Sequence, residues 1–312
     1  MKNLVTGSTG LVGMHIMMDL LKKDESVKAS YTQNSNIDYV KVIFKHYDLL
    51  DKFEQIEWVE MDLEDISQVI DAVKGVDHVY HSAAIVSFRK KDQQKMININ
   101  IHGTAKIVNA CLSENVKKLG FISSVAAIGR NKNGNYTEKN KWVSEGDNSF
   151  YAISKYKSEN EVWRGIEEGL CAVITNPGII IGPSMWNRSS TTIFKQLHKG
   201  LSYYPSGANG FVDARDVSRS IIQLVQSTIK SERFIVVGEN KSYEDVFKNI
   251  AQQMNISIPK KLATKKMLEW AWKFEALRCF FMRKSPGLTK ETARTSSQKN
   301  IYSNEKIINS LG

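Results

Sequence analysis

The sequence has few cysteines and no long apolar run. Cys111, Cys171 and Cys279 are too widely separated for a CxxC metal or redox pair and too few for a disulfide framework, so we expect buried, reduced thiols. No stretch of about 18 or more uncharged apolar residues is present, and no membrane-spanning segment is expected. Met1-Lys2 leads directly into a predicted strand, which leaves no room for the apolar core of a signal peptide. These absences predict a cytoplasmic protein.

Metal-ligand spacing and internal repeats are also lacking. The His, Asp and Cys residues are scattered, so no metal site is expected. No repeats or low-complexity segments are visible. The 312 residues are 42% hydrophobic and 24% charged, which is typical of a folded globular protein with two domains, or one large domain with an appendage.

Basic residues are in excess, with 43 Lys and Arg against 33 Asp and Glu and a net charge of +10. Such an excess is compatible with nucleic acid, a membrane surface or an acidic ligand as partner. Its distribution narrows the choice, because from Lys260 onward there are twelve basic and four acidic residues. The rest of the chain is nearly balanced, so nucleic acid is not expected as a partner.

Short apolar runs alternate with helical stretches over the first two thirds of the chain, which is typical of βαβ units in a parallel sheet. Strands are predicted at 2–6, 27–31, 56–60, 78–81, 118–122, 171–175 and 234–237. Apolar residues at three- and four-residue spacing predict helices at 11–21, 96–113 and 150–166, and further helices at 243–253 and 265–282. The predicted class is α/β, a doubly wound parallel sheet with a small, mostly helical C-terminal lobe.

A glycine-rich turn, Thr6-Gly7-Ser8-Thr9-Gly10-Leu11-Val12-Gly13, joins the first predicted strand to the first helix. Such a turn brings backbone N–H groups and a helix N-terminus close to a ligand, and both favour the negative charge of a pyrophosphate. The spacing is GxxGxxG, and no Lys-Ser or Lys-Thr follows as in a P-loop. An ordinary tight turn is the alternative. Strand, turn and helix fall where a dinucleotide needs them, which predicts a Rossmann-type site.

The end of the second predicted strand bears on cofactor choice. An acidic residue about 20 residues beyond the glycines would bond the ribose 2′-hydroxyl of NAD. This chain has Tyr31-Thr32-Gln33-Asn34-Ser35 there, with neither a carboxylate nor an arginine for the 2′-phosphate of NADP. Lys28 and Lys41 are only distant candidates for that phosphate. The expected cofactor is NAD(P), with NADP slightly favoured.

Tyr151 and Lys155 place a phenol and an ammonium on one face of a predicted helix. A nearby ammonium lowers a tyrosine pKa from about 10 and lets the hydroxyl exchange a proton with a carbonyl. The same spacing recurs at Tyr302 and Lys306, where a solvated helix face is expected. Only the first pair follows a strand ending in Ser123-Ser124, whose hydroxyls would lie at the carboxyl edge of the sheet.

In this combination the chain resembles the extended branch of the short-chain dehydrogenase/reductase superfamily, the NAD-dependent epimerase/dehydratase type. Further motifs follow in the family's order: Asp62-Leu63, His81-Ser82-Ala83-Ala84, Asn100-Ile101-His102-Gly103-Thr104, Ser123-Ser124 to Gly129, Asn176-Pro177-Gly178 to Gly182-Pro183, and Phe211-Val212-Asp213-Ala214-Arg215-Asp216-Val217. The last two are similar to the dihydroflavonol 4-reductase and 3β-hydroxysteroid dehydrogenase group. Sugar-nucleotide epimerases are close cousins, and the C-terminal lobe matches only loosely.

The resemblance implies a role for each matching residue. Tyr151 would be the proton donor or acceptor, Lys155 would lower its pKa and hold the nicotinamide ribose, and Ser124 would hydrogen-bond the substrate oxygen, with Ser123 as runner-up. A hydride would pass between the nicotinamide and the carbon bearing that oxygen. Asn176 departs from the arginine common before Pro-Gly in this group. The implied cofactor-binding residues are Gly7, Ser8, Thr9, Gly10, Leu11, Val12, Asp62, Leu63, Ser82, Ala83, Ala84, Asn100, Tyr151, Lys155 and Pro177.

Three of these positions also have structural interpretations. Asp62 would serve as a helix N-cap, with Asp65 three residues on. His81 ends a buried strand and would be a hydrogen-bonded core histidine. Asn100 would support the catalytic loop, with a proton-relay role as the alternative.

The chain divides accordingly into two expected parts. Residues 1–175, continued by about 206–240, form the dinucleotide-binding Rossmann domain, and residues 176–205 and 241–312 form the substrate-binding lobe. The stretches 130–148 and 185–210 are irregular and polar or rich in Gly and Pro, as expected of loops over a cleft.

An aromatic run extends from Met267 to Met282 and is too short and too charged to span a bilayer. It is expected to form core or a lid over an apolar substrate pocket. Its basic flanks, Lys265-Lys266 and Arg283-Lys284, make peripheral docking on an anionic membrane an alternative, and a protein interface a third.

We therefore predict an NAD(P)-dependent oxidoreductase that interconverts a carbonyl and an alcohol on a fairly apolar small molecule, working reductively with NADPH. The alternative within the class is a nucleotide-sugar epimerase or dehydratase with tightly bound NAD. The alternative from another class is a non-enzymatic dinucleotide-binding scaffold. Because the family often pairs through a helix bundle, a homodimer is also considered.

Overall fold

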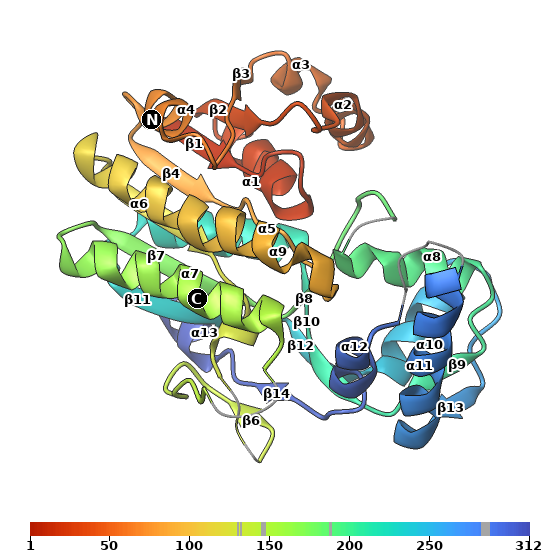
Figure 1. Cartoon of the computed structure of the whole chain (residues 1–312). Coiled ribbons are helices and arrows are strands. Elements are labelled where there is room, and N and C mark those ends of the chain that lie inside the picture. The colour runs from red at the N-terminus through yellow and green to blue at the C-terminus, as the bar shows by residue number, and fades with distance from the viewer. Residues whose placement is uncertain (130, 132, 145–147, 187–188, 282–287) are drawn as a thin grey trace.

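A seven-stranded parallel sheet forms the centre of the structure, a computed structural model that describes residues 1–312 except 130, 132, 145–147, 187–188 and 282–287 (Figure 1). In spatial order its strands are β11 (Glu232–Val236), β7 (Ala172–Pro177), β5 (Lys118–Ile122), β4 (His78–His81), β1 (Lys2–Thr6), β2 (Ser26–Tyr31) and β3 (Glu57–Glu60). All seven predicted strands are present, with ends displaced by a residue or two. The chain order reverses between β1 and β4, which makes the sheet doubly wound, as predicted, and ligands bind such sheets at the carboxyl ends of the strands near the reversal.

Helices cover both faces of this sheet. Figure 1 shows α6 (Gly103–Ser113) and α7 (Phe150–Glu167) side by side on the near face, where α4 (Ile66–Val73) joins them. The other face is covered by α1 (Leu11–Leu21), α2 (Ile37–His46), α3 (Leu50–Phe53), α9 (Ala214–Gln226) and α13 (Glu305–Leu311). The helix predicted at 96–113 is divided, because α5 (Gln93–Met96) and α6 flank a π-helical segment, η2 (Ile97–His102).

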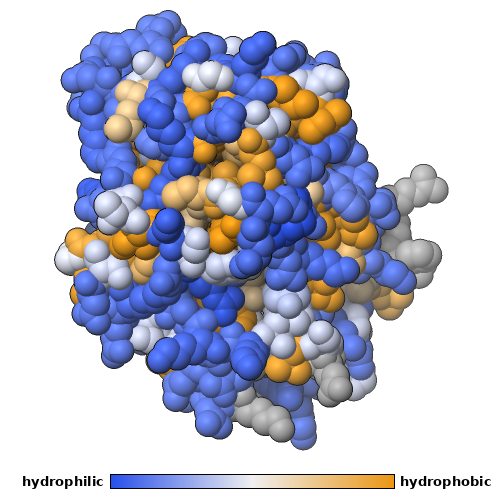
Figure 2. Space-filling view, turned by 90° about the vertical axis from the view of Figure 1, so that its left-hand side faces the viewer, coloured by the Kyte–Doolittle hydropathy of each residue, from blue (hydrophilic) through white to orange (hydrophobic). Residues whose placement is uncertain are grey.

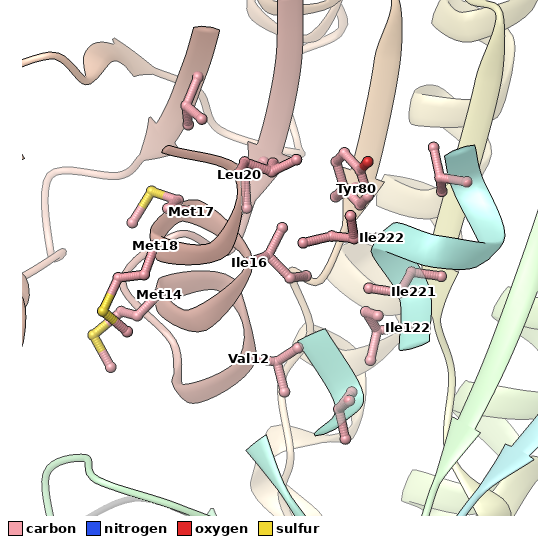
Figure 3. Packing of buried hydrophobic residues seen from close by; sticks show 14 of the residues in the cluster. Val12, Met14, Ile16, Met17, Met18, Leu20, Tyr80, Ile122, Ile221 and Ile222 are labelled. Atoms are coloured by element: carbon pink, nitrogen blue, oxygen red, sulfur yellow. The ribbon is translucent and has the colours of Figure 1, made fainter. Parts of the chain in front are cut away.

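Successive strand residues serve the two faces alternately, which follows from the two-residue period of a strand. On β4, Val79 belongs to the core under α4, α6 and α7, whereas Tyr80 belongs to the core under α1 and α9. Figure 3 shows Ile16 of α1 and Ile222 of α9 pointing toward each other beside Tyr80, while Met17 points to the opposite side of α1. The sheet is thus packed on both faces, and its carboxyl edge is the place left for a ligand.

Smaller sheets and further helices adjoin the main sheet. One sheet joins β8 (Ile179–Ile181), β10 (Ala208–Asp213) and β12 (Glu239–Ser242). Two-stranded sheets join β9 (Tyr203–Pro205) to β13 (Lys261–Ala263), and β6 (Asn135–Tyr136) to β14 (Ile301–Tyr302). The further helices are α8 (Thr192–His198), α10 (Tyr243–Gln253), α11 (Lys265–Phe281) and α12 (Lys290–Thr295). In Figure 1, α8, α10, α11, α12, β9 and β13 lie on the right, and β6 and β14 at the bottom.

Three sequence expectations need correction. The stretch 185–210 is not merely irregular, since it contains α8, β9 and the start of β10. The stretch 130–148 contributes β6 to a sheet, although part of it lies outside the described residues. The second tyrosine–lysine pair does not occupy a solvated helix face: Tyr302 is buried in β14, and the Lys306 ammonium on α13 pairs with Glu232 at 2.5 Å. Long-range strand pairing, which local spacing does not encode, accounts for β6, β9, β10 and β14.

Within the described residues, no helix combines the length and apolarity needed to cross a bilayer. The three cysteines are free thiols. Cys111 and Cys279 are buried, as expected, and Cys171 is partly exposed. The end of the predicted helix at Met282 lies outside the described residues.

Candidate functional site

The turn after β1 has the shape of a phosphate cradle. Gly7 has a φ of +64°, and a Cβ atom there would lie 2.7 Å from the Ala83 backbone. A Cβ atom on Gly13 would lie 2.3 Å from the Gly7 carbonyl oxygen, so only glycine lets α1 pack directly behind the turn. Gly10 is exposed, and its nearest described neighbour for a Cβ atom is the Gly7 carbonyl oxygen at 3.1 Å. The turn therefore leaves Gly10 open to an approaching ligand.

The N-terminus of α1 also lacks a polar cap. Its N-cap residue is Gly10, which has no side chain to accept hydrogen bonds, whereas Asp65 caps α4 and Ser149 caps α7 with side-chain oxygens. The N–H groups of Leu11 and Val12 are therefore available to an outside acceptor, and the helix dipole favours an anion there. These residues fit a dinucleotide pyrophosphate. The Ser8 hydroxyl is used internally, because it donates to the Ser30 carbonyl at 2.5 Å.

The loop after β4 lies beside this turn. Strands β1 and β4 are parallel neighbours with Thr6 opposite His81, so the residues that follow each strand meet at the same edge. The Thr6 hydroxyl accepts hydrogen bonds from the backbone N–H groups of Ser82 and Ala83, both at 3.2 Å. The structure thus brings the predicted cofactor residues 7–12 and 82–84 together.

His81 is a hydrogen-bonded core histidine, as the sequence predicted. It is fully buried, and its ring bonds Thr6 at 2.7 Å and Thr104 at 3.0 Å. The Thr104 hydroxyl donates its own proton to the Asn100 carbonyl, so the His81 Nε2–H must donate to Thr104 and its Nδ1 must accept from Thr6. Burial lowers the pKa of His81 to about 3. The ring is therefore neutral and fully partnered.

Asp62 and Leu63 follow β3, two strands away from β1. Asp62 is exposed, and its carboxylate accepts the Glu64 N–H at 2.9 Å. The N-cap of α4 is Asp65 instead, so the helix-cap interpretation of Asp62 is wrong. Leu63 is buried against Gly103. A cavity of about 470 Å³ opens nearby without containing any predicted site residue; it is lined by Glu64, Asn98, His102, Ala105, Lys106 and Asn109.

Asn100, in the π-helical segment η2, holds two parts of the site in place. Its side-chain oxygen accepts the Ile85 N–H at 2.7 Å, and its amide nitrogen donates to the Ile85 carbonyl and to the Ser154 hydroxyl. The Ser154 hydroxyl in turn donates to the Tyr151 carbonyl at 2.8 Å. Asn100 thereby ties the loop after β4 to the first turns of α7. The two donated bonds use both hydrogens of the Asn100 amide. Asn100 therefore supports the structure of the site.

Tyr151 and Ser124 meet at the carboxyl edge of the sheet. Tyr151 lies in the first turn of α7, and Ser124 follows β5 and caps a short 3₁₀ turn, Val125–Ala127. Desolvation raises the pKa of the Tyr151 phenol above its usual value, and a hydrogen bond with Ser124 opposes this shift. The Phe88 ring, which sequence reasoning missed, packs edge-on against Tyr151 with centroids 5.8 Å apart.

Lys155 is buried one helical turn beyond Tyr151. Its ammonium donates to the Ile122 carbonyl at 2.9 Å and lies 4.5 Å from the centroid of the Phe121 ring. Burial lowers the pKa of Lys155 to about 8. The expected lowering of the Tyr151 pKa by Lys155 is not found in this arrangement, because the ammonium is directed to the β5 backbone and desolvation of the phenol dominates.

Ser123 faces away from Ser124, into a buried polar cluster. Its hydroxyl donates to the Glu159 carboxylate at 2.7 Å. Asn176 donates to the same carboxylate at 2.8 Å and to the Ser124 carbonyl at 3.0 Å, and Arg233 pairs with Glu159 at 3.1 Å. Sequence reasoning missed Glu159 and Arg233. The one available signal was that Glu159 stands four residues after Lys155, hence on the same helix face.

The remaining predicted residues lie at the edges of the site. Pro177 is the buried last residue of β7. Neither lysine considered for a 2′-phosphate is available. The Lys28 ammonium donates to the Ala72 carbonyl at 3.1 Å, and Lys41 pairs with Glu54 at 2.8 Å. After β2, Thr32 and Ser35 form a hydrogen-bonded turn that is largely exposed.

The comparisons with known proteins agree with this geometry. The model of the NAD dependent epimerase/dehydratase family matches residues 3–238. The chain belongs to this family. As a member of the epimerase/dehydratase family and of the extended short-chain dehydrogenase/reductase superfamily, it is an NAD(P)-dependent oxidoreductase, as predicted.

Two relatives and one crystal structure show how far the likeness to other epimerase/dehydratase proteins extends. Sterol demethylase protein B from Methylococcus capsulatus is 30% identical over 242 residues, which cover 77% of this chain and 70% of that protein. A putative dihydroflavonol 4-reductase from Synechocystis is 26% identical over 318 residues, which cover 99% of this chain and 88% of that protein. The crystal structure of gox2253 is 26% identical with a TM-score of 0.81, covering 99% of this chain and 92% of that one.

Proposed function

We propose that this protein is an NADPH-dependent reductase that converts a carbonyl group on a fairly apolar small molecule to an alcohol. The observation that carries the proposal is the pairing of Tyr151 with Ser124 at the carboxyl edge of the sheet. A tyrosine phenol, with an ordinary pKa of about 10, is protonated at neutral pH, and desolvation raises the Tyr151 pKa further, so the phenol can donate a proton. A proton donor at this position fits the reduction of a carbonyl group.

The chain's own residues have defined tasks in this reaction. The N–H groups at the start of α1 would hold the pyrophosphate. Lys155, one turn beyond Tyr151, would hold the nicotinamide ribose. NADPH, when bound, supplies the hydride. Ser124 and Tyr151 together hydrogen-bond the substrate carbonyl oxygen. The Tyr151 O–H bond breaks as its proton moves to that oxygen. To stabilise the phenolate that is left, the Lys155 ammonium would have to turn toward it from the Ile122 carbonyl.

An apolar substrate is supported by the side chains near Tyr151. Phe88 contacts the phenol ring and is 36% exposed, and Val86 in the same loop is 43% exposed. Exposed apolar residues beside a catalytic group gain by covering an apolar ligand. The names of the relatives, a dihydroflavonol reductase and a sterol demethylase protein, point to the same class of molecule. We assign substrate binding to residues 176–205 and 241–312.

NADPH rather than NADH is supported by the end of β2. Thr32, Gln33 and Asn34 are exposed there, and none carries a negative charge that would repel a 2′-phosphate. The amide side chains of Gln33 and Asn34 can donate hydrogen bonds to it. Since Lys28 and Lys41 are engaged elsewhere, these neutral donors are the ones we assign to the phosphate.

The test is a fluorescence titration of purified protein with NADPH and with NADH, followed by a screen of apolar ketones and aldehydes. We expect NADPH to bind more tightly, Gly10→Glu to abolish binding, and Tyr151→Phe to keep NADPH binding but lose turnover. NAD that stays bound through purification would favour the nucleotide-sugar epimerase or dehydratase alternative. Binding of neither cofactor, with none already bound, would leave the scaffold alternative.

A further inference from the structure

Helix α11 presents an apolar stripe to solvent. Its members are Met267, Trp270, Phe274 and Leu277, which are 43%, 62%, 66% and 56% exposed. At about 100° per residue the four side chains fall within an arc of roughly 80° on one face of the helix. The Trp270 and Phe274 rings lie next to each other with centroids 6.3 Å apart. Of the two forms expected for this run, core or a lid, core is wrong for these four residues.

The opposite face of α11 holds the helix on the protein. Its described residues there are Leu268, Trp272, Glu275, Ala276 and Cys279, which are partly or fully buried. The helix thus has one attached face and one free apolar face. For comparison, Figure 2 shows a different side of the molecule on which hydrophilic residues predominate and apolar ones form small separate areas. Scattered apolar residues of that kind are normal on a protein surface, but a continuous stripe marks an interaction site.

Basic residues border the stripe. By the same helical geometry Lys266 and Lys273 lie along one edge and Arg278 along the other. Lys265 precedes them in the first turn, and Lys261 is exposed just before it. Arg278 pairs with Glu275, but among the described residues no carboxylate pairs with Lys266 or Lys273. The Lys273 ammonium instead lies 5.1 Å from the centroid of the Trp270 ring. An apolar stripe between cations suits a surface that is apolar inside and anionic outside.

We propose that α11 docks the protein on an anionic membrane surface, with the stripe in the boundary between headgroups and acyl chains. An exposed tryptophan beside lysines is the composition of helices that lie in this boundary. A second copy is disfavoured. In a twofold interface each stripe would face an identical stripe, and the lysines along its edge, which have no carboxylate partner among the described residues, would face like charges. Docking goes beyond the proposed reduction and would place the site where an apolar substrate is concentrated.

The test is co-sedimentation of the full chain with phosphatidylcholine vesicles, with and without phosphatidylglycerol at about one third of the lipid. We expect binding to the anionic vesicles only. Trp270→Glu with Phe274→Glu should weaken it roughly tenfold or more, because two exposed anchors become anions. The double change Lys266→Gln and Lys273→Gln should weaken binding to anionic vesicles by about fivefold for each lysine removed. High salt should also weaken the binding of the wild type, because it screens the lysine charges.

The matched control is Val42→Glu on α2, which changes another exposed apolar side chain, 59% exposed, and should leave vesicle binding unchanged. NADPH titration of each variant verifies that it is folded. Wild-type protein that stays in solution with anionic vesicles, or that binds them equally after the Trp270 and Phe274 changes, overturns the proposal. The proposal is also overturned if light scattering shows a concentration-dependent dimer that is lost only in the variant carrying both Trp270→Glu and Phe274→Glu. None of these results depends on whether the protein reduces a carbonyl.

Discussion

Ser123 donates a 2.7 Å hydrogen bond to the buried carboxylate of Glu159, while the next residue, Ser124, forms a hydrogen bond with the Tyr151 phenol. Two adjacent serines at the end of β5 therefore belong to different hydrogen-bond networks: Ser123 to the buried cluster around Glu159, and Ser124 to the site around Tyr151. Glu159 is 2% exposed and also bonds Arg233 and Asn176. Since Asn176 in turn holds the Ser124 carbonyl, the cluster supports the segment that carries Ser124.

Replacing Glu159 by glutamine should destabilise the protein by about 3 kcal/mol, because it leaves the largely buried Arg233 guanidinium without its counter-charge. The measurement is urea unfolding. The control is Glu161→Gln on the same helix, whose partner Arg164 is partly exposed, and a loss under about 1 kcal/mol is expected there. Equal losses for the two variants would contradict the assignment of Glu159 to a buried ion pair.

The two serines should respond differently to alanine. Ser124→Ala removes the hydroxyl that we assign to the substrate oxygen, so kcat should fall by about 10². Stability should fall by about 1 kcal/mol, because the cap of the Val125–Ala127 turn is lost. Ser123→Ala leaves a buried carboxylate with one partner fewer, so stability should fall by about 2 kcal/mol while kcat changes little. Steady-state kinetics give kcat, and urea unfolding gives the stability, of both variants. A larger kcat loss in Ser123→Ala would reverse the assignment.

Lys155 should make stability depend on pH in the alkaline range. Its pKa is about 8 in the folded protein and 10.5 as an ordinary lysine, so between these values the unfolded chain binds more protons. Stability from this group therefore rises with pH across that window, with a slope approaching about 1.4 kcal/mol per pH unit. The measurement is the unfolding free energy of the wild type and of Lys155→Met from pH 7.5 to 10.5. The slope of this free energy against pH should be greater in the wild type by the amount given. Parallel curves would show that Lys155 has an ordinary pKa.

Cofactor choice should respond to charge at the end of β2. Gln33→Asp places a carboxylate where the 2′-phosphate of NADPH would lie, so NADPH affinity should fall by roughly tenfold or more and NADH affinity should rise. Fluorescence titration with both cofactors measures this directly. Gln33→Asn keeps the side chain neutral and should preserve the order of the wild type. Unchanged NADPH affinity in Gln33→Asp would move the phosphate site away from β2.

Much of the site could be predicted because its parts are local. The glycine turn, the Tyr151–Lys155 spacing and the alternation of strands and helices are each written in a few neighbouring residues, and parallel pairing then brings the strand ends to one edge. Side-chain periodicity predicted that Tyr151 and Lys155 share a helix face. It did not predict where the Lys155 ammonium points, because that depends on the Ile122 carbonyl of another strand.

The sequence by itself determined the fold class, the glycine-rich turn after β1 and the shared helix face of Tyr151 and Lys155, because local conformation and hydrophobic burial specify these. Only the tertiary structure decided which serine meets Tyr151, since Glu159 and Arg233 come from elements far apart in the chain and draw Ser123 inward. It also decided that the α11 stripe faces solvent. Both outcomes depend on which surfaces pack against each other, and packing partners at long sequence separation leave no local pattern to be read.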